Sequence, residues 1–268
     1  MVENILKRNN VSVIGQGSQP MLLAHGFGCD QNMWRFVVPA FAADYKIILF
    51  DYVGSGKSDL GAYSTERYGD LQGYVQDIID ICQALELSKV NFVGHSVSSI
   101  IGILASIQAP GLFEKLILIA PSPCYINDLP DYFGGFERKD IEDLLDVMEK
   151  NYIGWASFLA PMVMKNSDRP ELTQELETSF CSTDPLVASD FARTTFYSDN
   201  RQDLAKVTLP SLILQCAEDA IAPTSVGEYM HRHLAQSNLR LMKATGHCPH
   251  MSHPQETIDM IKEYLICR

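Results

Sequence analysis

The stretch "VNFVGHSVSSIIGILASI", Val90–Ile107, decides the fold of this chain. Its first residues are typical of a buried strand, and the apolar segment that follows at once is typical of a helix. Ser96, between the two, would occupy a tight strand-to-helix turn with a strained backbone and an exposed hydroxyl. Such a turn needs small residues two positions away on either side, here Gly94 and Ser98. Serine replaces the usual glycine at position 98, but it is small, so the pattern still predicts a nucleophilic Ser96.

A serine nucleophile requires a base, and the base requires a carboxylate that orients it. In folds with this turn the carboxylate and the histidine follow the serine in that order. Asp219 ends the apolar run "SLILQCAED", where active-site loops leave the carboxyl edge of a parallel sheet. Glu218 is an alternative, but Asp219 lies farther into the loop. His247 follows an expected strand and a glycine, so we predict Ser96, Asp219 and His247 as the catalytic residues.

Two backbone N–H groups are expected to form an oxyanion hole. The turn places Ser96 at the start of a helix, where free N–H groups stabilise negative charge, so the N–H of Val97 is one expected donor. The second donor should come from the loop after an earlier strand, here "HGFGCD". Phe27, flanked by two glycines, is the natural candidate. His25 is expected to orient this loop and not to act as a base.

Short apolar runs alternate with longer amphipathic segments over most of the chain. The runs expected to form buried parallel strands are Met21–Gly26, Lys46–Asp51, Val90–His95, Lys115–Pro121 and Ser211–Asp219. Between them, Asp70–Leu87 has the periodicity of an amphipathic helix. This alternation predicts an α/β fold with a mostly parallel central sheet and helices on both faces. Ile5–Gly15 is a candidate for a short hairpin at the sheet edge.

Residues 124–200 interrupt the alternation of strands and helices. Three segments there have helical periodicity with no strand between them, namely "KDIEDLLDVMEKNY", "WASFLAPMVMK" and "ELTQELETSF". We therefore predict a core formed by residues 1–123 and 201–268, with residues 124–200 inserted as a helical lid (cap). The aromatic residues of this insert suggest an apolar roof over a pocket.

Composition narrows the class of partner. The net charge of −12 argues against binding of nucleic acid or of an anionic membrane. The N-terminus lacks the apolar run of a signal peptide, and no apolar window is long enough for a membrane span. The seven cysteines are scattered without a CxxC motif and are interpreted as reduced thiols. We expect a cytoplasmic protein that binds a small hydrophobic substrate or ligand.

Two motifs partly match a cofactor site or a metal site, but neither match is complete. "DYVGSGKSD", Asp51–Asp59, ends like a phosphate-binding loop, but Asp51 replaces the first glycine of that motif and would repel a polyphosphate. We interpret this segment as a loop beside the site that Asp51 fastens by hydrogen bonds. His247, His250 and His253 are evenly spaced, but no cluster of Cys or Asp accompanies them with a known ligand spacing. We therefore expect neither a cofactor nor a metal.

Several finer motifs point to one family. They are "GFGCDQNMW", "FDYVGSGKSD", "FVGHSVS", "PSPCY", "GGFE", "EKNYIGWA", "FCSTDP", "PSLILQCAED" and "GHCPHMSHP". With these motifs the chain resembles the α/β-hydrolase superfamily and, within it, the RsbQ-type hydrolases of bacilli. The plant karrikin and strigolactone receptors are related and share the "GHSVS" form of the turn. The resemblance implies an α/β-hydrolase fold with a four-helix lid.

The resemblance also implies roles for individual residues. Ser96, Asp219 and His247 match the catalytic triad of these proteins, and the N–H groups of Phe27 and Val97 match the oxyanion donors. The positions that match the lining of an apolar pocket under the lid are Phe136, Trp155, Phe158 and Phe196.

Function follows from the same resemblance. RsbQ-type proteins act with a PAS-domain serine phosphatase to activate a general-stress sigma factor. The resemblance therefore implies a serine hydrolase that acts on a small hydrophobic ester or lactone and serves as a positive regulator of that stress response. Two alternatives stay open. One is a metabolic carboxylesterase without a partner, and the other is a ligand-binding signalling receptor with vestigial catalysis, since plant relatives signal through conformational change.

Overall fold

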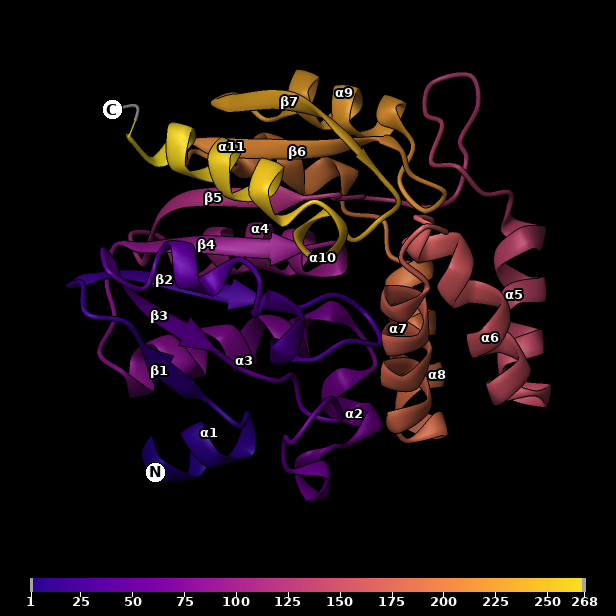
Figure 1. The fold of residues 1–268 in the computed structure, drawn as a ribbon, viewed down its shortest axis with the longest axis horizontal. Helices are drawn as coiled ribbons and strands as arrows, with labels where there is room; N and C mark the ends of the chain where they lie inside the picture. Colours follow the sequence, from indigo (N-terminus) through magenta and orange to yellow (C-terminus); the bar gives the residue numbers. More distant parts are fainter. Residues whose placement is uncertain (1, 267–268) are drawn as a thin grey trace.

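The computed structural model describes residues 2–266 and is built around a seven-stranded sheet (Figure 1). Its strands, in chain order, are β1 (Ser12–Ile14), β2 (Gln19–Ala24), β3 (Tyr45–Leu49), β4 (Val90–His95), β5 (Phe113–Ile119), β6 (Ser211–Glu218) and β7 (Ser237–Thr245). Their spatial order is β1-β3-β2-β4-β5-β6-β7, and all neighbouring pairs are parallel except β1 with β3. The predicted mostly parallel α/β sheet is therefore confirmed.

The N-terminal segment differs from the prediction. Ile5–Gly15 does not form a hairpin, because its first residues belong to the helix α1 (Val2–Arg8), and only β1 joins the sheet edge. An acidic residue in the first turn of α1 and basic residues in its last turn suit the helix dipole. Arg8 then holds α1 against the sheet-covering helix α3, with its guanidinium 3.0 Å from the carboxylates of both Asp77 and Asp80.

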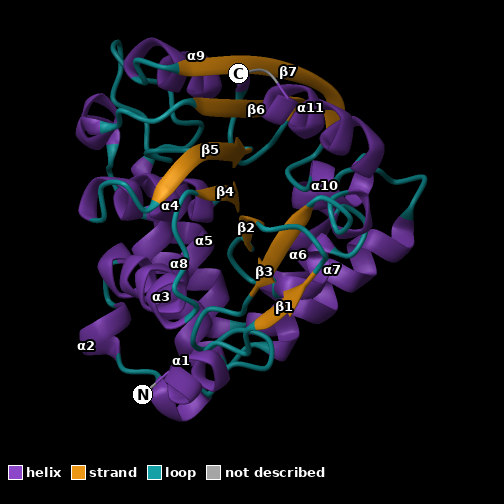
Figure 2. Cartoon of the chain, turned by 90° about the vertical axis from the view of Figure 1, so that its left-hand side faces the viewer, coloured by secondary structure: helices purple, strands orange, loops and turns teal. Residues whose placement is uncertain are grey.

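Helices cover both faces of the sheet (Figure 2). The helices outside residues 124–200 are α1, α2 (Thr65–Tyr68), α3 (Leu71–Ala84), α4 (Val97–Gln108), α9 (Thr224–His233), α10 (Pro249–Ser252) and α11 (Pro254–Ile266). Side chains of α3, α4 and α9 pack in one apolar layer, and those of α11 pack in the other. Along β2, Leu22 and Ala24 face the first layer while Met21 and Leu23 face the second, as strand alternation requires.

Residues 124–200 contain four helices. They are α5 (Arg138–Lys150), α6 (Tyr152–Met164), α7 (Pro170–Ser182) and α8 (Pro185–Phe196). They stand beyond the carboxyl ends of the central strands, to the right of the sheet in Figure 1. The helical character of the insert is as predicted, and a fourth helix follows the three segments singled out by periodicity. The division of the chain into core and lid at residues 124 and 200 stays a prediction.

The described part of the chain contains free cysteines and only short helices. Within residues 2–266, six cysteines are free thiols, and Cys267 lies outside the described residues. No helix in the described part of the chain is long and apolar enough to cross a bilayer.

Candidate active site

Ser96 occupies the junction of β4 and α4 in the predicted turn. Its backbone has φ 57° and ψ −126°, a left-handed conformation that a non-glycine residue adopts only when its surroundings enforce it. Gly94 is required by contact, since a Cβ atom there would lie 2.7 Å from the carbonyl group of Ser98. The strained turn is therefore confirmed, and it presents the Ser96 hydroxyl at the carboxyl edge of the sheet.

Ser98 has a role that its size alone did not reveal. Its side chain is fully buried, and its hydroxyl donates a hydrogen bond to the backbone carbonyl of His25. Because that proton is used, the Tyr52 hydroxyl is the donor in its 3.0 Å contact with the Ser98 oxygen. A serine in place of glycine thus ties α4 to the loops that follow β2 and β3.

A hydrogen-bonded series links the serine to a buried acid. His247 Nε2 lies 2.7 Å from Ser96 Oγ, and His247 Nδ1 lies 2.7 Å from Asp219 Oδ2. The Asp219 side chain is fully buried, and its Oδ1 accepts hydrogen bonds from the backbone N–H groups of Ile221 and Ala222 at 2.8 and 3.1 Å. The structure thus brings together the residues that the sequence predicts as nucleophile, base and acid. With Asp219 accepting at Nδ1, the neutral imidazole is free to take a proton at Nε2.

Glu218, the alternative acid, lies elsewhere. Its side chain is more than half exposed and forms an ion pair with Lys165 at the end of α6. This neighbour holds the pKa of the Glu218 carboxyl below its usual range through a charged hydrogen bond. Glu218 is the last residue of β6, and Asp219 is the first residue beyond it, as the preference for the loop position requires.

The two predicted oxyanion donors are free. Among the described residues, the backbone N–H groups of Phe27 and Val97 donate to no protein acceptor. Gly26 allows the loop after β2 to approach the turn closely, because a Cβ atom there would lie 2.5 Å from His95 Nδ1 and 3.3 Å from Ser96 Cβ. A helix N-terminus and a glycine-flanked loop are thus available to bind a negative oxygen beside Ser96.

The loops behind the site are fixed by buried polar groups. His25 Nε2 accepts a hydrogen bond from the backbone N–H of Tyr52 at 3.1 Å, and burial lowers the pKa of its ring. Asp51 accepts hydrogen bonds from the backbone N–H groups of Gln31 at 2.8 Å and Lys57 at 2.9 Å. Both residues therefore orient and fasten loops, as the sequence predicts.

Two further histidines stand behind His247. His95 Nε2 contacts the His247 carbonyl oxygen at 2.7 Å, and the rings of His95 and His250 have centroids 4.4 Å apart. Burial lowers the pKa of His95 well below its usual value and that of His250 to about 3, so both rings are neutral. His250 also packs on Trp34, with ring centroids 4.7 Å apart. In the part of the chain that the structure describes, no group of three His, Cys, Asp or Glu residues is arranged to hold a metal ion.

A small cavity of about 30 Å³ adjoins Ser96 and His247. Apolar side chains from the loop after β2 and from α6, α7 and α8 form much of its wall. Pockets that bind drug-sized ligands measure roughly 300–1,000 Å³. The cavity is therefore much smaller than a pocket that encloses a drug-sized ligand.

The four predicted pocket aromatics have different positions. Phe196 lines the cavity, whereas Trp155 is buried one layer behind it, with its ring 6.1 Å from that of Phe27. Phe136 packs behind Phe196 at 6.4 Å. Phe158 is 60% exposed and points away from the cavity, so its prediction was wrong. The helix α6 turns its other side inward.

The cavity is also lined by residues that the sequence did not single out. They are Cys29, Tyr125, Leu159, Val163, Leu176, Phe180, Thr195, Ile221 and Cys248, and His95 also lines the cavity. Tyr125 carried a usable signal, because "PSPCY" follows β5 directly at the carboxyl edge of the sheet, and Cys29, Ile221 and Cys248 likewise lie in loops that follow β2, β6 and β7. Leu159, Val163, Leu176, Phe180 and Thr195 lie on α6, α7 and α8, whose inward faces the periodicity alone did not identify.

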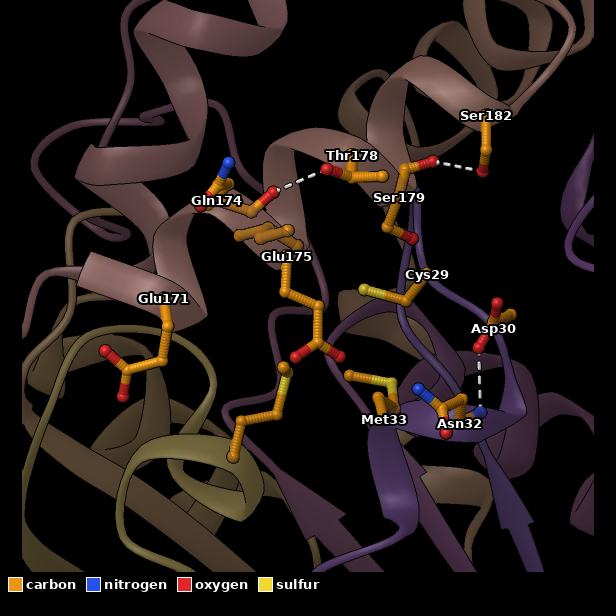
Figure 3. Close-up of a pocket in the computed structure, with 12 residues that line it drawn as sticks. Cys29, Asp30, Asn32, Met33, Glu171, Gln174, Glu175, Thr178, Ser179 and Ser182 are labelled. Carbon is orange, nitrogen blue, oxygen red and sulfur yellow. Dashed lines mark hydrogen bonds between the residues drawn. The ribbon is translucent and has the colours of Figure 1, made fainter. Parts of the chain in front are cut away.

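A larger cleft of about 560 Å³ opens on the outside, between α7 and the loop after β2 (Figure 3). Glu175 of α7 and Cys29 of the loop face each other across it. Cys29 and Leu176 line both this cleft and the inner cavity, so one layer of side chains separates the two. Arg35 holds α7 against the loop through two hydrogen bonds to the Glu175 carboxylate, at 2.7 and 2.6 Å.

Comparison with known proteins places this site in a family. Residues 21–260 match the model of the alpha/beta hydrolase family, so this chain belongs to that family. The strained serine turn, the order of Ser96, Asp219 and His247, and the sheet topology are the features expected of its members.

Individual relatives are similar over nearly the whole chain. A probable esterase from Oryza sativa subsp. japonica is 39% identical over 96% of this chain and 95% of its own length. The karrikin insensitive 2 receptor CA of Petunia hybrida is 37% identical over 96% of this chain and 95% of its own length. Among solved structures, a hydrolase from Oleispira antarctica is 48% identical, with a TM-score of 0.97 over 100% of this chain and 98% of that chain.

Proposed function

We propose that this protein is a serine hydrolase that cleaves a small, largely apolar ester or lactone. The observation that supports this proposal best is the series of 2.7 Å hydrogen bonds from Ser96 through His247 to Asp219. The free backbone N–H groups of Phe27 and Val97 accompany it. The proposal is supported by relatives whose names describe an esterase and a hydrolase.

The arrangement allows a two-stage reaction. Ser96 Oγ attacks the carbonyl carbon while His247 Nε2 takes its proton, and Asp219 stabilises the resulting imidazolium. The N–H groups of Phe27 and Val97 bind the oxygen that becomes negative, and each such donor contributes roughly 10²–10³ to turnover. The tetrahedral intermediate then expels the alcohol, which receives the proton from His247. Water, deprotonated by His247, releases the acid and restores Ser96.

The walls of the cavity favour an uncharged substrate. Among the described residues that line it, none is Asp, Glu, Lys or Arg. Burial raises the pKa of the lining thiols Cys29 and Cys248, which are therefore protonated and neutral. A charged substrate group placed there would lose its hydration without gaining an ionic partner, which is costly.

Hydrolysis of p-nitrophenyl butanoate tests this function. We expect measurable turnover by the wild-type protein and loss of turnover in both Ser96→Ala and His247→Ala. Ser106→Ala is the matched control, because Ser106 is a buried serine of the same helix whose hydroxyl only bonds the Ile103 carbonyl. The proposal fails if the wild-type protein does not hydrolyse the ester, or if Ser96→Ala retains the activity.

We further propose that the hydrolase is of the RsbQ type and acts in the cytoplasm as a positive regulator of a general-stress sigma factor, with a PAS-domain serine phosphatase as partner. The motif resemblance supports this role, and free thiols fit a reducing compartment. Exposed apolar side chains of Phe158 and Met162, four residues apart on α6, favour a protein partner, since exposed apolar patches mark interaction surfaces. Co-purification with the phosphatase, lost in Phe158→Asp but kept in Ser96→Ala, is the expected result.

Two other roles would use the same site. A signalling receptor with vestigial catalysis is favoured by the similarity to a protein named as a receptor. A metabolic carboxylesterase would need no partner. Normal stress signalling by Ser96→Ala favours the receptor, whereas rapid turnover of a metabolic ester without phosphatase binding favours the carboxylesterase.

A further inference from the structure

Two buried hydroxyl groups in the cavity wall have no use in the mechanism above. Tyr125 and Thr195 both line the cavity, and they are only 1% and 2% exposed. In the described part of the chain, neither hydroxyl makes a hydrogen bond of ordinary geometry. Buried polar groups in folded proteins nearly always have a partner, and exceptions at a binding cavity indicate where a ligand supplies one.

The two hydroxyls reach the cavity from separate elements. Tyr125 follows β5, and its ring packs on Phe196 with centroids 5.2 Å apart. Burial raises the pKa of Tyr125, and contact with the Ser96 hydroxyl only partly opposes this, so the phenol keeps its proton and can donate. Thr195 belongs to α8, one residue before Phe196. The surrounding wall is otherwise mostly apolar, so few other groups could satisfy a polar atom of a substrate.

We propose that Tyr125 and Thr195 form a polar subsite that binds a second acceptor oxygen of the substrate, close to the scissile carbonyl group. This inference rests on the proposed hydrolase function. Tyr125, Thr195 and Ser96 line the same cavity of about 30 Å³, and Ser96 Oγ must approach the carbonyl carbon to within about 3–3.5 Å. In so small a cavity, an oxygen that both hydroxyls bind lies near that carbon, and an oxygen on the neighbouring carbon, two bonds away, meets this requirement.

The substrate class is accordingly narrower than an apolar ester. It is an ester or lactone with an ether or keto oxygen on the carbon next to the scissile carbonyl. Hydroxyl donors in a dry wall discriminate well, because a substrate that lacks the oxygen displaces solvent and leaves both donors unpaired.

A pair of matched esters tests the subsite. Phenyl methoxyacetate and phenyl butanoate have acyl chains of equal length and differ by one ether oxygen. We expect the wild-type kcat/KM, normalised to the hydroxide-catalysed rate of each ester, to favour methoxyacetate by roughly tenfold or more. Tyr125→Phe and Thr195→Val should each reduce that preference by roughly 3–10-fold.

Tyr74→Phe is the matched control. Tyr74 is also a buried tyrosine whose hydroxyl has no hydrogen-bond partner among the described residues, but it lies outside the cavity. Loss of the Tyr74 hydroxyl should leave the preference for methoxyacetate over butanoate unchanged. A preference that is absent in the wild-type protein, or that persists in the Tyr125→Phe/Thr195→Val protein, overturns the proposal.

Binding separates this inference from the proposed function. Calorimetric titration of both esters into the Ser96→Ala protein measures the subsite without turnover. If the wild-type protein hydrolyses neither ester, the hydrolase proposal fails. The affinities of the two esters for the Ser96→Ala protein then test the subsite alone. Tighter binding of methoxyacetate, lost when Tyr125→Phe is added, supports the subsite. Equal affinities, or a difference that survives Tyr125→Phe, refute it.

Discussion

The imidazole Nε2 of His95 lies 2.7 Å from the backbone carbonyl oxygen of His247. Because a carbonyl only accepts hydrogen bonds, His95 carries its proton on Nε2, and burial keeps the pKa of the ring well below its usual value. The bond fixes the backbone of the residue whose ring joins Ser96 to Asp219. His95 is therefore a positioning residue for the proposed base.

Replacement of His95 should lower kcat more than it changes KM. His95→Ala removes the donor to the His247 carbonyl, and we expect kcat to fall by about tenfold because the base is less well oriented. His95→Gln offers an N–H group at similar reach and should recover most of the loss. Equal kcat for the alanine and glutamine variants would show that the hydrogen bond has no positioning role.

Asp219→Asn should nearly abolish activity. An amide cannot both accept from His247 Nδ1 and stabilise the imidazolium, and we expect a fall in kcat of roughly 10³–10⁴. Glu218→Gln is the matched control, since this exposed neighbour only pairs with Lys165. Comparable losses in the two variants, measured with the same ester, would mean that the acid is wrongly assigned.

Ser98→Gly should cost stability. Glycine preserves the space of the turn but removes the hydroxyl that donates to the His25 carbonyl and accepts from Tyr52. We expect the free energy of unfolding to drop by about 1–3 kcal/mol, since two buried polar groups lose their partner. Urea denaturation measures this. An unchanged midpoint would show that these bonds contribute nothing net.

His250 makes stability depend on pH. Burial lowers its pKa from 6.5 to about 3, so between these values the unfolded chain binds a proton that the native ring does not. The free energy of unfolding should therefore decrease as pH falls through this window, by up to about 1.4 kcal/mol per pH unit from this group. In His250→Leu the free energy of unfolding should decrease less steeply with falling pH, by up to about 1.4 kcal/mol per pH unit. Denaturation curves of both proteins at several pH values measure it, and parallel slopes would contradict it.

Much of the site was predictable because its residues lie where strands end. Ser96, Asp219 and Phe27 follow β4, β6 and β2, whose carboxyl ends meet at one edge of the sheet. Short apolar runs located these strands, and the turn chemistry of glycine and serine located the loops. His247 then followed from residue order and from the strand β7 before it.

Residues on the inserted helices were harder to place, and α6 shows the reason. Its sequence "YIGWASFLAPMVM" is apolar on every side, so periodicity does not say which face is buried. Trp155, Leu159 and Val163, four residues apart, form the inward face, and Phe158 lies about 100° around the helix from Leu159. The positions of Tyr125 and Thr195 in the cavity wall depend on tertiary packing, which no local pattern encodes.

Covalent labelling of Ser96 tests the central claim most directly. Methanesulfonyl fluoride is small, and attack by an activated serine oxygen forms an O–S bond and releases fluoride. Peptide mass spectrometry should show one methanesulfonyl group on Ser96 in the wild-type protein, none in Ser96→Ala, and much slower labelling in His247→Ala. An unlabelled Ser96, or a label on another residue, in protein that still hydrolyses p-nitrophenyl butanoate would contradict the account.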